Sequence, residues 1–196
     1  MKNDEEIQRY ADKLFIECIN ECKASDLPLG TVQPHIKISS ATAVFGYLVK
    51  ETGQIFISRV TFELSEHVIK NVIIHELIHS VSGADNHGKT FKYWADVMNK
   101  RGWQIETRSD LKQLVELSGK RMEDIALPGA VLLVCRDCGN YILRKENAKM
   151  VRLIGKYRCY KCKGYLDVIS VDENGNRRNA SNEQSEILMK SIMCGG

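Results

Sequence analysis

The sequence predicts an α+β protein built from a helical core with a small antiparallel sheet, followed by a ribbon held by four cysteines. Three observations predict this fold class. Apolar residues recur at helical spacing near the amino terminus and around a histidine-rich stretch. Short alternating runs lie between these helical patterns. Two Cys-x-x-Cys pairs follow in the second half of the chain, a pattern typical of a zinc ribbon.

The first helix is predicted over residues 4–24, where apolar side chains repeat with a period near 3.6, and Pro28 and Gly30 end it. Three alternating runs predict the strands of the sheet, at residues 36–39, 43–50 and 54–58. The short segment 51–53 contains a glycine and predicts a hairpin between the last two strands.

The central helix is predicted over residues 68–81, with the sequence VIKNVIIHELIHSV. Its apolar side chains surround most of the circumference, so we expect it to be buried. Ser65 is the expected N-cap, and Gly83 is the expected stop. A further helix is predicted over residues 89–100.

The rest of the chain carries weaker signals. Ser109 could cap a short helical segment with leucines at 111, 114 and 117, and Pro128-Gly129 marks a break before the ribbon. We therefore predict a core at 1–128, a zinc ribbon at 129–170 and a polar, flexible tail at 171–196, with a short helix near Ile187.

The histidines of the central helix predict a hydrolytic zinc site. His75 and His79 are four residues apart, so their Cβ atoms lie roughly 6 Å apart on one helix face, close enough to share a tetrahedral ion. His87 follows after a turn short enough to return it to the pair. Glu76 lies beside the first ligand, where its carboxylate could deprotonate a water molecule activated by the metal.

Other assignments stay open at this point. The HExxH pattern also occurs by chance, and His87 could be an ordinary loop histidine beside a glycine. Asp85 is the nearest rival third ligand, and Asp96 or Glu106 could serve at greater range.

The cysteines predict a second, structural zinc site. Cys135, Cys138, Cys159 and Cys162 form two pairs with twenty residues between them, and the segment between the pairs could fold as a hairpin. Gly139 and Gly164 supply permissive backbone beside the pairs. Cys18 and Cys22 share the apolar face of the first helix and are expected to be buried thiols, and Cys194 is expected to be free.

Composition favours a globular chain that stays in the cytoplasm. The hydrophobic fraction is 43% and the charged fraction 27%, and no apolar run reaches the roughly 18 residues of a membrane span. The beginning, MKNDEEIQRY, lacks the apolar core of a secretory signal. Seven cysteines in such a chain indicate reduced thiols or metal ligands.

The ribbon carries most of the positive charge. Residues 131–170 hold nine lysines and arginines against three acidic residues, a balance of +6, while the rest of the chain holds 19 against 22. Four thiolates on one zinc would leave the ribbon near +4. Lys156, Arg158, Lys161 and Lys163 alternate with tyrosines, which suits contact with DNA, although the tyrosines could instead fill the ribbon's small core.

The motifs HELIH and HGKTF, followed by the two cysteine pairs, resemble the SprT-like zinc metalloproteases, a resemblance that covers roughly residues 4–165. It implies a zincin-like core in which His75, His79 and His87 bind a catalytic zinc and Glu76 is the acid/base. Relatives include the Spartan proteases, which digest proteins crosslinked to DNA. This implies a protein substrate and a nucleoid-associated or nuclear setting.

Two functions follow from these patterns. The chain is either a zinc metalloendopeptidase, acting on DNA-associated proteins, or a non-catalytic zinc-ribbon protein that binds nucleic acid and has a structural metal at its HExxH helix. Glu76 separates the two, because only a catalytic site needs that carboxylate. The oligomeric state is left open by the sequence.

Overall fold

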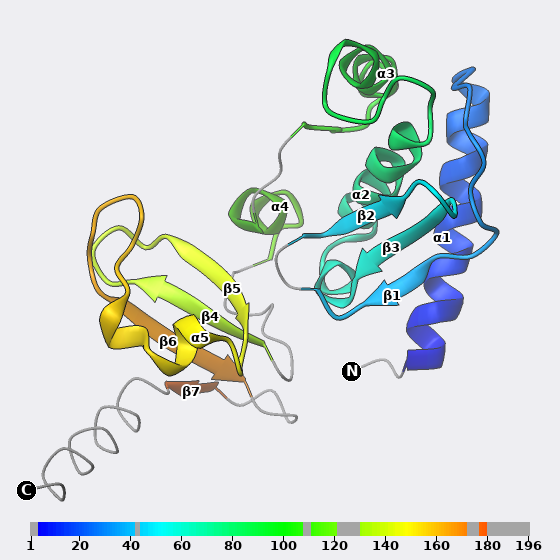
Figure 1. The fold of residues 1–196 in the computed structure, drawn as a ribbon. Helices are drawn as coiled ribbons and strands as arrows, with labels where there is room; N and C mark the ends of the chain where they lie inside the picture. The colour runs from blue at the N-terminus through cyan, green and yellow to red at the C-terminus, as the bar shows by residue number, and fades with distance from the viewer. Residues whose placement is uncertain (1–3, 42–43, 108–110, 121–129, 172–176, 180–196) are drawn as a thin grey trace, which may run out of the picture. The chain divides into compact units, whose positions relative to one another are not determined.

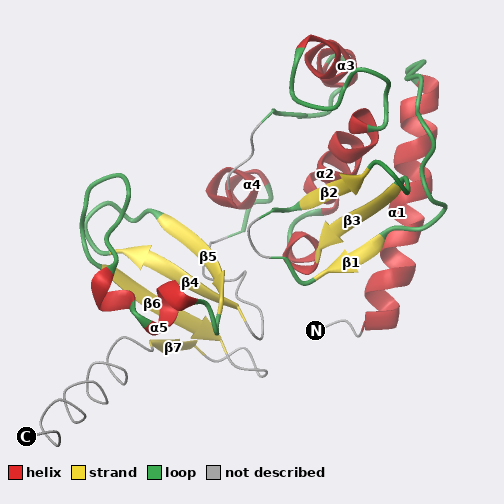
Figure 2. Cartoon of the chain, viewed as in Figure 1, coloured by secondary structure: helices red, strands yellow, loops and turns green. Residues whose placement is uncertain are grey.

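The computed structural model of this chain describes residues 4–41, 44–107, 111–120, 130–171 and 177–179 (Figure 1). Contacts divide the chain into two compact units, residues 1–120 and 121–196. Helices and small sheets occur in both units, which confirms the α+β class (Figure 2).

The first unit combines four α-helices with a three-stranded sheet among its described residues. The helices are α1 (Asp4–Ala24), α2 (Glu66–His79), α3 (Lys89–Asn99) and α4 (Leu111–Leu117). The strands are β1 (Lys37–Ser39), β2 (Gly46–Val49) and β3 (Gln54–Ser58), and a 3₁₀ turn, η1 (Arg59–Glu63), follows them.

The sheet has the order β1-β3-β2 and is mixed, so the predicted antiparallel sheet is wrong in this detail. β2 and β3 form the expected antiparallel hairpin, with Val49 opposite Gln54 beside the turn. β3 then enters between β2 and β1, and Lys37 pairs with Phe56 in a parallel ladder. The parallel pairing arises because the chain leaves β1, crosses to the far edge and returns through the hairpin.

Helices α1 and α2 cover one face of this sheet, and their apolar side chains form the core (Figure 1). Ile73, Ile74 and Leu77 on α2 are fully buried, which confirms that the helix is apolar around its circumference. Cys18 and Cys22 of α1 are buried in the same core, as predicted. Burial raises the pKa of the Cys22 thiol to about 12, so it stays neutral.

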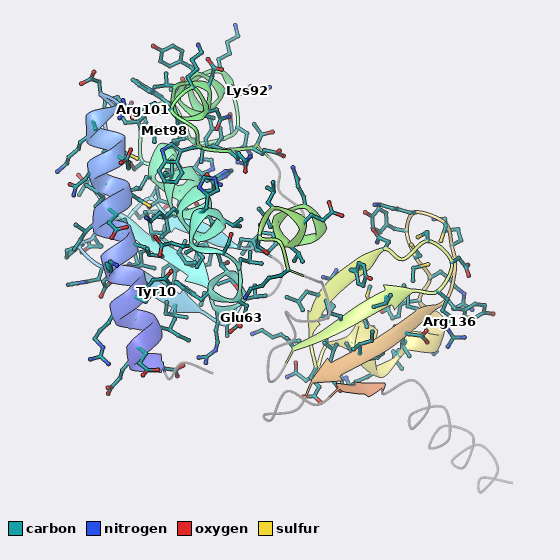
Figure 3. All side chains as sticks on the ribbon, turned by 180° about the vertical axis from the view of Figure 1, so that it is seen from behind. Tyr10, Glu63, Lys92, Met98, Arg101 and Arg136 are labelled. Atoms are coloured by element: carbon teal, nitrogen blue, oxygen red, sulfur yellow. The ribbon has the colours of Figure 1, made fainter. Side chains whose placement is uncertain are left out.

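Polar contacts at the surface join α1 to α2. Lys70 on α2 lies 2.7 Å from a carboxylate oxygen of Glu17 and 2.9 Å from one of Glu66. The Tyr10 hydroxyl donates to Glu66 at 3.0 Å, and Figure 3 labels Tyr10 on α1. The two helices therefore share one charged network beside their apolar contact.

The second unit is an antiparallel sheet of order β5-β4-β6-β7. Its strands are β4 (Ala130–Cys135), β5 (Tyr141–Lys145), β6 (Leu166–Val171) and β7 (Arg177–Asn179). A short helix α5 (Lys149–Arg152) and a 3₁₀ turn η3 (Ile154–Lys156) connect β5 to the second cysteine pair. The segment between the cysteine pairs is therefore one strand and two helical turns, whereas the sequence predicted a hairpin there.

Several predicted boundaries shift. Helix α2 begins two residues before the predicted start and ends at His79, and Ser65 occupies the N-cap position without a side-chain cap bond. Strand β2 begins at Gly46. β7 lies within the predicted tail, where its three residues pair with β6.

The expectations for Ser109, Pro128-Gly129, the helix near Ile187 and Cys194 concern positions outside the described residues. No helix in the described part of the chain is both long and apolar enough to cross a bilayer.

Candidate functional site

Three imidazoles meet at the end of α2. Nε2 of His87 lies 3.0 Å from Nε2 of His75 and 3.2 Å from Nε2 of His79. His75 and His79 come from successive turns of α2, and His87 comes from the loop before α3. Gly83 lies in that loop with a φ of +79°, a left-handed conformation that helps the chain reverse. The structure therefore brings together the three predicted ligand residues.

The spacing of these nitrogens fits a zinc ion. Zinc–nitrogen bonds of 2.0–2.1 Å in a tetrahedron place two ligand nitrogens about 3.3 Å apart, close to the distances observed here. A bound ion would also stabilise three ring nitrogens that all face one point, since their lone pairs repel one another. Three neutral histidines are a ligand set that zinc prefers.

Backbone groups fix the orientation of two of these rings. Nδ1 of His79 lies 2.7 Å from the carbonyl oxygen of Ala84 and donates to it, which leaves Nε2 as the acceptor that faces the cluster. The His75 ring forms a hydrogen bond with the backbone of Glu106. Burial, together with the imidazoles of His79 and His87, lowers the pKa of His75 to about 3. Burial likewise lowers the pKa of His79, so both rings are neutral at pH 7, as metal ligands must be.

Phe91 supports the cluster from within the core. Its ring is fully buried, and its centroid lies 4.7 Å from the centroid of each of the three imidazoles. Phe91 is the aromatic residue of the HGKTF motif and lies on the first turn of α3. The motif thus supplies both a candidate ligand, His87, and the apolar surface on which the three histidine rings pack.

Glu76 is a buried carboxyl next to the cluster, with only 6% of its surface exposed. Burial raises its pKa to about 8, and a hydrogen bond from the backbone of Leu48 opposes that shift. A divalent ion held by the histidines would favour the charged form of Glu76. A carboxyl whose pKa lies near neutral pH can both accept and release a proton there, which suits general acid/base chemistry.

Strand β2 makes room for Glu76. A Cβ atom at Gly46 would lie 3.0 Å from Glu76 Cγ and 3.2 Å from its Oε1, so a larger residue would displace the carboxyl. The segment before Gly46 is held by the hydroxyl of Thr61, which donates to the Phe45 carbonyl at 3.0 Å, and by the Ser58 N–H, which donates to the same carbonyl at 2.7 Å. The sheet thereby fixes the wall opposite Glu76.

The rival ligands are engaged elsewhere. Asp85 forms an ion pair with Lys50 at the end of β2. A carboxylate oxygen of Asp96 lies 2.8 Å from Nζ of Lys100, and Oε1 of Glu106 accepts a hydrogen bond of 2.6 Å from Gln113. Within the described residues, the group of possible metal ligands at this site consists of His75, His79 and His87.

The loop after α3 lies against α2 and is held by two asparagines. The Gln104 N–H donates to Oδ1 of Asn71 at 3.0 Å. Asn99 receives a bond of 2.6 Å from the Ile105 N–H and donates one of 3.0 Å to the Ile105 carbonyl. These side chains satisfy the hydrogen-bonding groups of the backbone at Gln104 and Ile105, which lies outside any helix or strand. The segment is therefore held in place beside His75.

The second group of candidate metal ligands is in the ribbon. Sγ atoms of Cys135 and Cys162 lie 3.3 Å apart, and those of Cys138 and Cys159 lie 3.6 Å apart. Tetrahedral zinc with bonds of about 2.3 Å separates two sulfurs by about 3.8 Å, so the four thiols fit one ion. No disulfide links the cysteines of the described part of the chain.

The two cysteine turns have the same backbone form. Gly139 donates to the Cys135 carbonyl at 3.0 Å, and Lys163 donates to the Cys159 carbonyl at 2.9 Å. Both donors have a φ of +65°. Lys163 therefore has the same position in the second turn as Gly139 has in the first. The predicted Gly164 has a different role: it allows the close approach of Asp137, with which a Cβ at position 164 would collide.

The four predicted nucleic-acid contacts, Lys156, Arg158, Lys161 and Lys163, are all exposed. Two tyrosines beside them are exposed as well, Tyr160 by 65% and Tyr165 by 57%. The guanidinium of Arg158 lies 3.9 Å from the centroid of the Tyr165 ring. Tyr157 instead packs on the buried Cys135, Cys159 and Leu166, so one of the three tyrosines belongs to the core.

A family model described as the YgjP-like metallopeptidase domain matches residues 4–112, more than half of the chain. The chain belongs to the YgjP-like metallopeptidase family. This assignment confirms the resemblance to the SprT-like metallopeptidases. No curated protein and no solved structure matches the chain. The YgjP-like match includes the three histidines and Glu76, and it ends before the cysteine ribbon.

Sequence reasoning missed the residues that hold this site in place. Leu48 and Ala84 act through backbone groups, which have no side-chain signature in the sequence. Gly46 did carry a signal, since glycine within a strand often marks a close approach of another group. Asn71 also carried one, because it is an amide within the apolar helical run one turn before His75, and the structure buries it.

Proposed function

We propose that this YgjP-like protein is a zinc-dependent metalloendopeptidase. The observation that carries the proposal is the convergence of three histidine Nε2 atoms beside the buried carboxyl of Glu76. The family match supports a peptidase, and the donor set supports zinc. In this proposal, His75, His79 and His87 hold the catalytic ion, and the four ribbon cysteines hold a structural one.

Glu76 performs the proton transfers in the proposed reaction. When bound, zinc supplies Lewis-acid chemistry, polarising the scissile carbonyl and acidifying water. Glu76 accepts a proton from the attacking water and later delivers it to the amine that leaves. Leu48 and Gly46 hold the carboxyl in place for both transfers. His79 is kept in the tautomer that presents Nε2 by its bond to Ala84.

The direct test is Glu76→Gln, which keeps the size of the side chain and removes its basicity. We expect the variant to retain its zinc and to lose cleavage of a casein substrate by at least about a hundredfold, the scale of general-base catalysis. Glu51→Gln, in the exposed hairpin turn, is the matched control and should keep both properties. Cleavage by Glu76→Gln at the rate of the unmodified protein would contradict the proposal.

We further propose that the ribbon directs the enzyme to DNA-associated proteins. The exposed Tyr160 and Tyr165 offer faces on which bases can stack, and the surrounding lysines and arginine suit phosphate contacts. The second candidate function, a nucleic-acid-binding protein with a structural metal at the HExxH helix, uses the same surface. Both functions suit a reducing compartment such as the cytoplasm, because unpaired thiols persist there. Contact with DNA would place the protein at the nucleoid or in the nucleus.

The DNA proposal has its own experiment. We expect binding of single-stranded DNA, measured by fluorescence anisotropy, to weaken with salt, and the slope against log salt to fall by about 3 when Lys156, Arg158, Lys161 and Lys163 are changed to glutamine. The control for net charge is a variant in which four lysines of the first unit, Lys13, Lys23, Lys89 and Lys92, are changed to glutamine, since it loses the same number of positive charges. Equal effects of the two quadruple variants would contradict a ribbon interface and would leave the peptidase proposal intact.

A further inference from the structure

A hollow of about 220 Å³ begins at the candidate active site and extends along α2. Four residues of α2 line it, Asn71, Val72, His75 and Glu76. Asn71 and Val72 precede His75 by four and three residues, which is one helical turn. The hollow therefore starts at the ligand residues and runs one turn towards the amino-terminal end of the helix.

Several apolar side chains line the hollow, together with the polar residues Asn71, Gln104 and Thr107. Val72 lines it from α2, Ile105 from the loop after α3 and Leu114 from α4, and all three side chains are buried. Glu106 also borders the hollow, but its carboxylate accepts the hydrogen bond from Gln113. This chemistry suits a hydrocarbon group and disfavours a charged one.

The walls of the hollow are formed before any ligand enters. Asn99 binds both backbone groups of Ile105, and Asn71 accepts a bond from Gln104. Phe45 and Gly46 also line the hollow, and they belong to the segment that Thr61 and Ser58 hold. A preformed wall needs little ordering when a ligand binds, so less of the free energy gained by burying an apolar group is lost to ordering the protein.

We propose that this hollow is a substrate subsite that receives a bulky apolar side chain, such as leucine or phenylalanine, from a residue flanking the scissile bond. The proposal rests on the peptidase function, because it uses the position of the hollow beside His75 and Glu76. The volume suits one large side chain. Burying a leucine side chain there should strengthen binding by tenfold or more. This follows from the free energy of roughly 1.5–3 kcal/mol that is gained when such a side chain leaves water.

A binding experiment tests the subsite without relying on turnover. Two N-acylated hydroxamates, one of leucine and one of glycine, are titrated into the zinc-loaded protein by calorimetry, since both place the same chelating group at the metal. We expect the leucine compound to bind at least about tenfold more tightly. Equal affinities, or no binding of either compound, would overturn the subsite.

Two valines of α2 provide matched variants. Val72→Ala enlarges the hollow, so a third hydroxamate, that of phenylalanine, should gain affinity relative to the leucine compound. Val68→Ala makes the same change one turn earlier, at a buried position that does not line the hollow, and should leave the preference unaltered. If both variants shift the preference equally, the hollow does not select the side chain.

Cleavage-site mapping of a peptide library separates the two proposals. Selective hydroxamate binding without cleavage of any peptide would overturn the peptidase function, and the hollow would then be an apolar binding pocket and not a substrate subsite. Cleavage without a preference for an apolar residue beside the scissile bond would overturn the subsite and leave the peptidase function standing. The expected result is cleavage with a leucine or phenylalanine preference on one side of the bond.

Discussion

At the scale of single residues, the site depends on contacts that hold Glu76 and the histidines in fixed orientations. The three histidines and the carboxylate follow from a motif, because helical spacing alone places His75 and His79 on one face. The supporting contacts join positions far apart in the chain, such as Leu48 with Glu76, so local patterns cannot reveal them. Gly46 is the exception, since its place within a strand is itself informative.

Gly46→Ala tests the space beside Glu76. The added Cβ would lie 3.0 Å from Glu76 Cγ, which is closer than ordinary contact, so the carboxyl must move. We expect at least about a tenfold loss of kcat/KM, because small displacements of a catalytic group are costly, with zinc content unchanged. Gly155→Ala, where a Cβ meets nothing within 4 Å, is the control. Full activity of Gly46→Ala would show that the contact does not position Glu76.

The paired cysteine turns give a second prediction at this scale. Gly139 and Lys163 share a left-handed φ of +65°, a conformation that costs a residue with a side chain about 1 kcal/mol. We therefore expect Gly139→Ala to destabilise the ribbon and Lys163→Gly to stabilise it, each by about 1 kcal/mol, in thermal unfolding of the zinc-loaded chain. Changes of the same sign in both variants would rule out this explanation.

At the scale of elements, the helices are where the sequence was most informative. Their long periodic patterns identified α1, α2 and α3 nearly to their ends. The sheets were less predictable, because strand order depends on contacts between distant segments. The parallel pairing of β1 with β3 and the addition of β7 both depend on such pairings. β1 and β7 have three residues each, which is too short for an alternating pattern that would predict the strand with which each one pairs.

The network between α1 and α2 should make stability depend on pH. Hydrogen bonds from Lys70 and Tyr10 lower the pKa of Glu66 below its ordinary value. Its ion pairing therefore stabilises the fold at neutral pH, and this contribution is lost as the pH falls through the lowered pKa. Because Glu66 is half exposed, we expect Glu66→Gln to cost only about 0.5 kcal/mol at pH 7 and nothing in strong acid.

Urea unfolding at a series of pH values checks the Glu66 prediction, with Glu51→Gln as the surface control. A loss of stability that persists unchanged into strong acid would assign the effect to packing and not to the charge of Glu66.

At the scale of the whole molecule, the chain combines a YgjP-like metallopeptidase unit with a separate cysteine ribbon. Motif spacing predicted both groups of candidate metal-ligand residues that the structure brings together, because histidine and cysteine spacing is set by coordination chemistry. The division into 1–128, 129–170 and 171–196 remains a prediction, whereas the contacts within the chain place the boundary between the two compact units after residue 120.

Cys159→Ser tests whether the two metal sites are independent. The substitution removes one ligand of the ribbon, so we expect the zinc content to fall from two ions per chain to one. The first unit has its own core and ligand residues, so cleavage of a protein substrate in the absence of DNA should persist. Loss of both ions would show that the histidine site depends on the ribbon.

The most direct measurement is X-ray diffraction from zinc-loaded crystals at wavelengths on either side of the zinc absorption edge. The structure predicts an anomalous peak within bonding distance of Nε2 of His75, His79 and His87, with the Glu76 carboxylate beside it but not bound to it. A peak that lacks His87 as a ligand, or the absence of any peak at these three nitrogens in crystals that show zinc on the ribbon cysteines, would contradict the account.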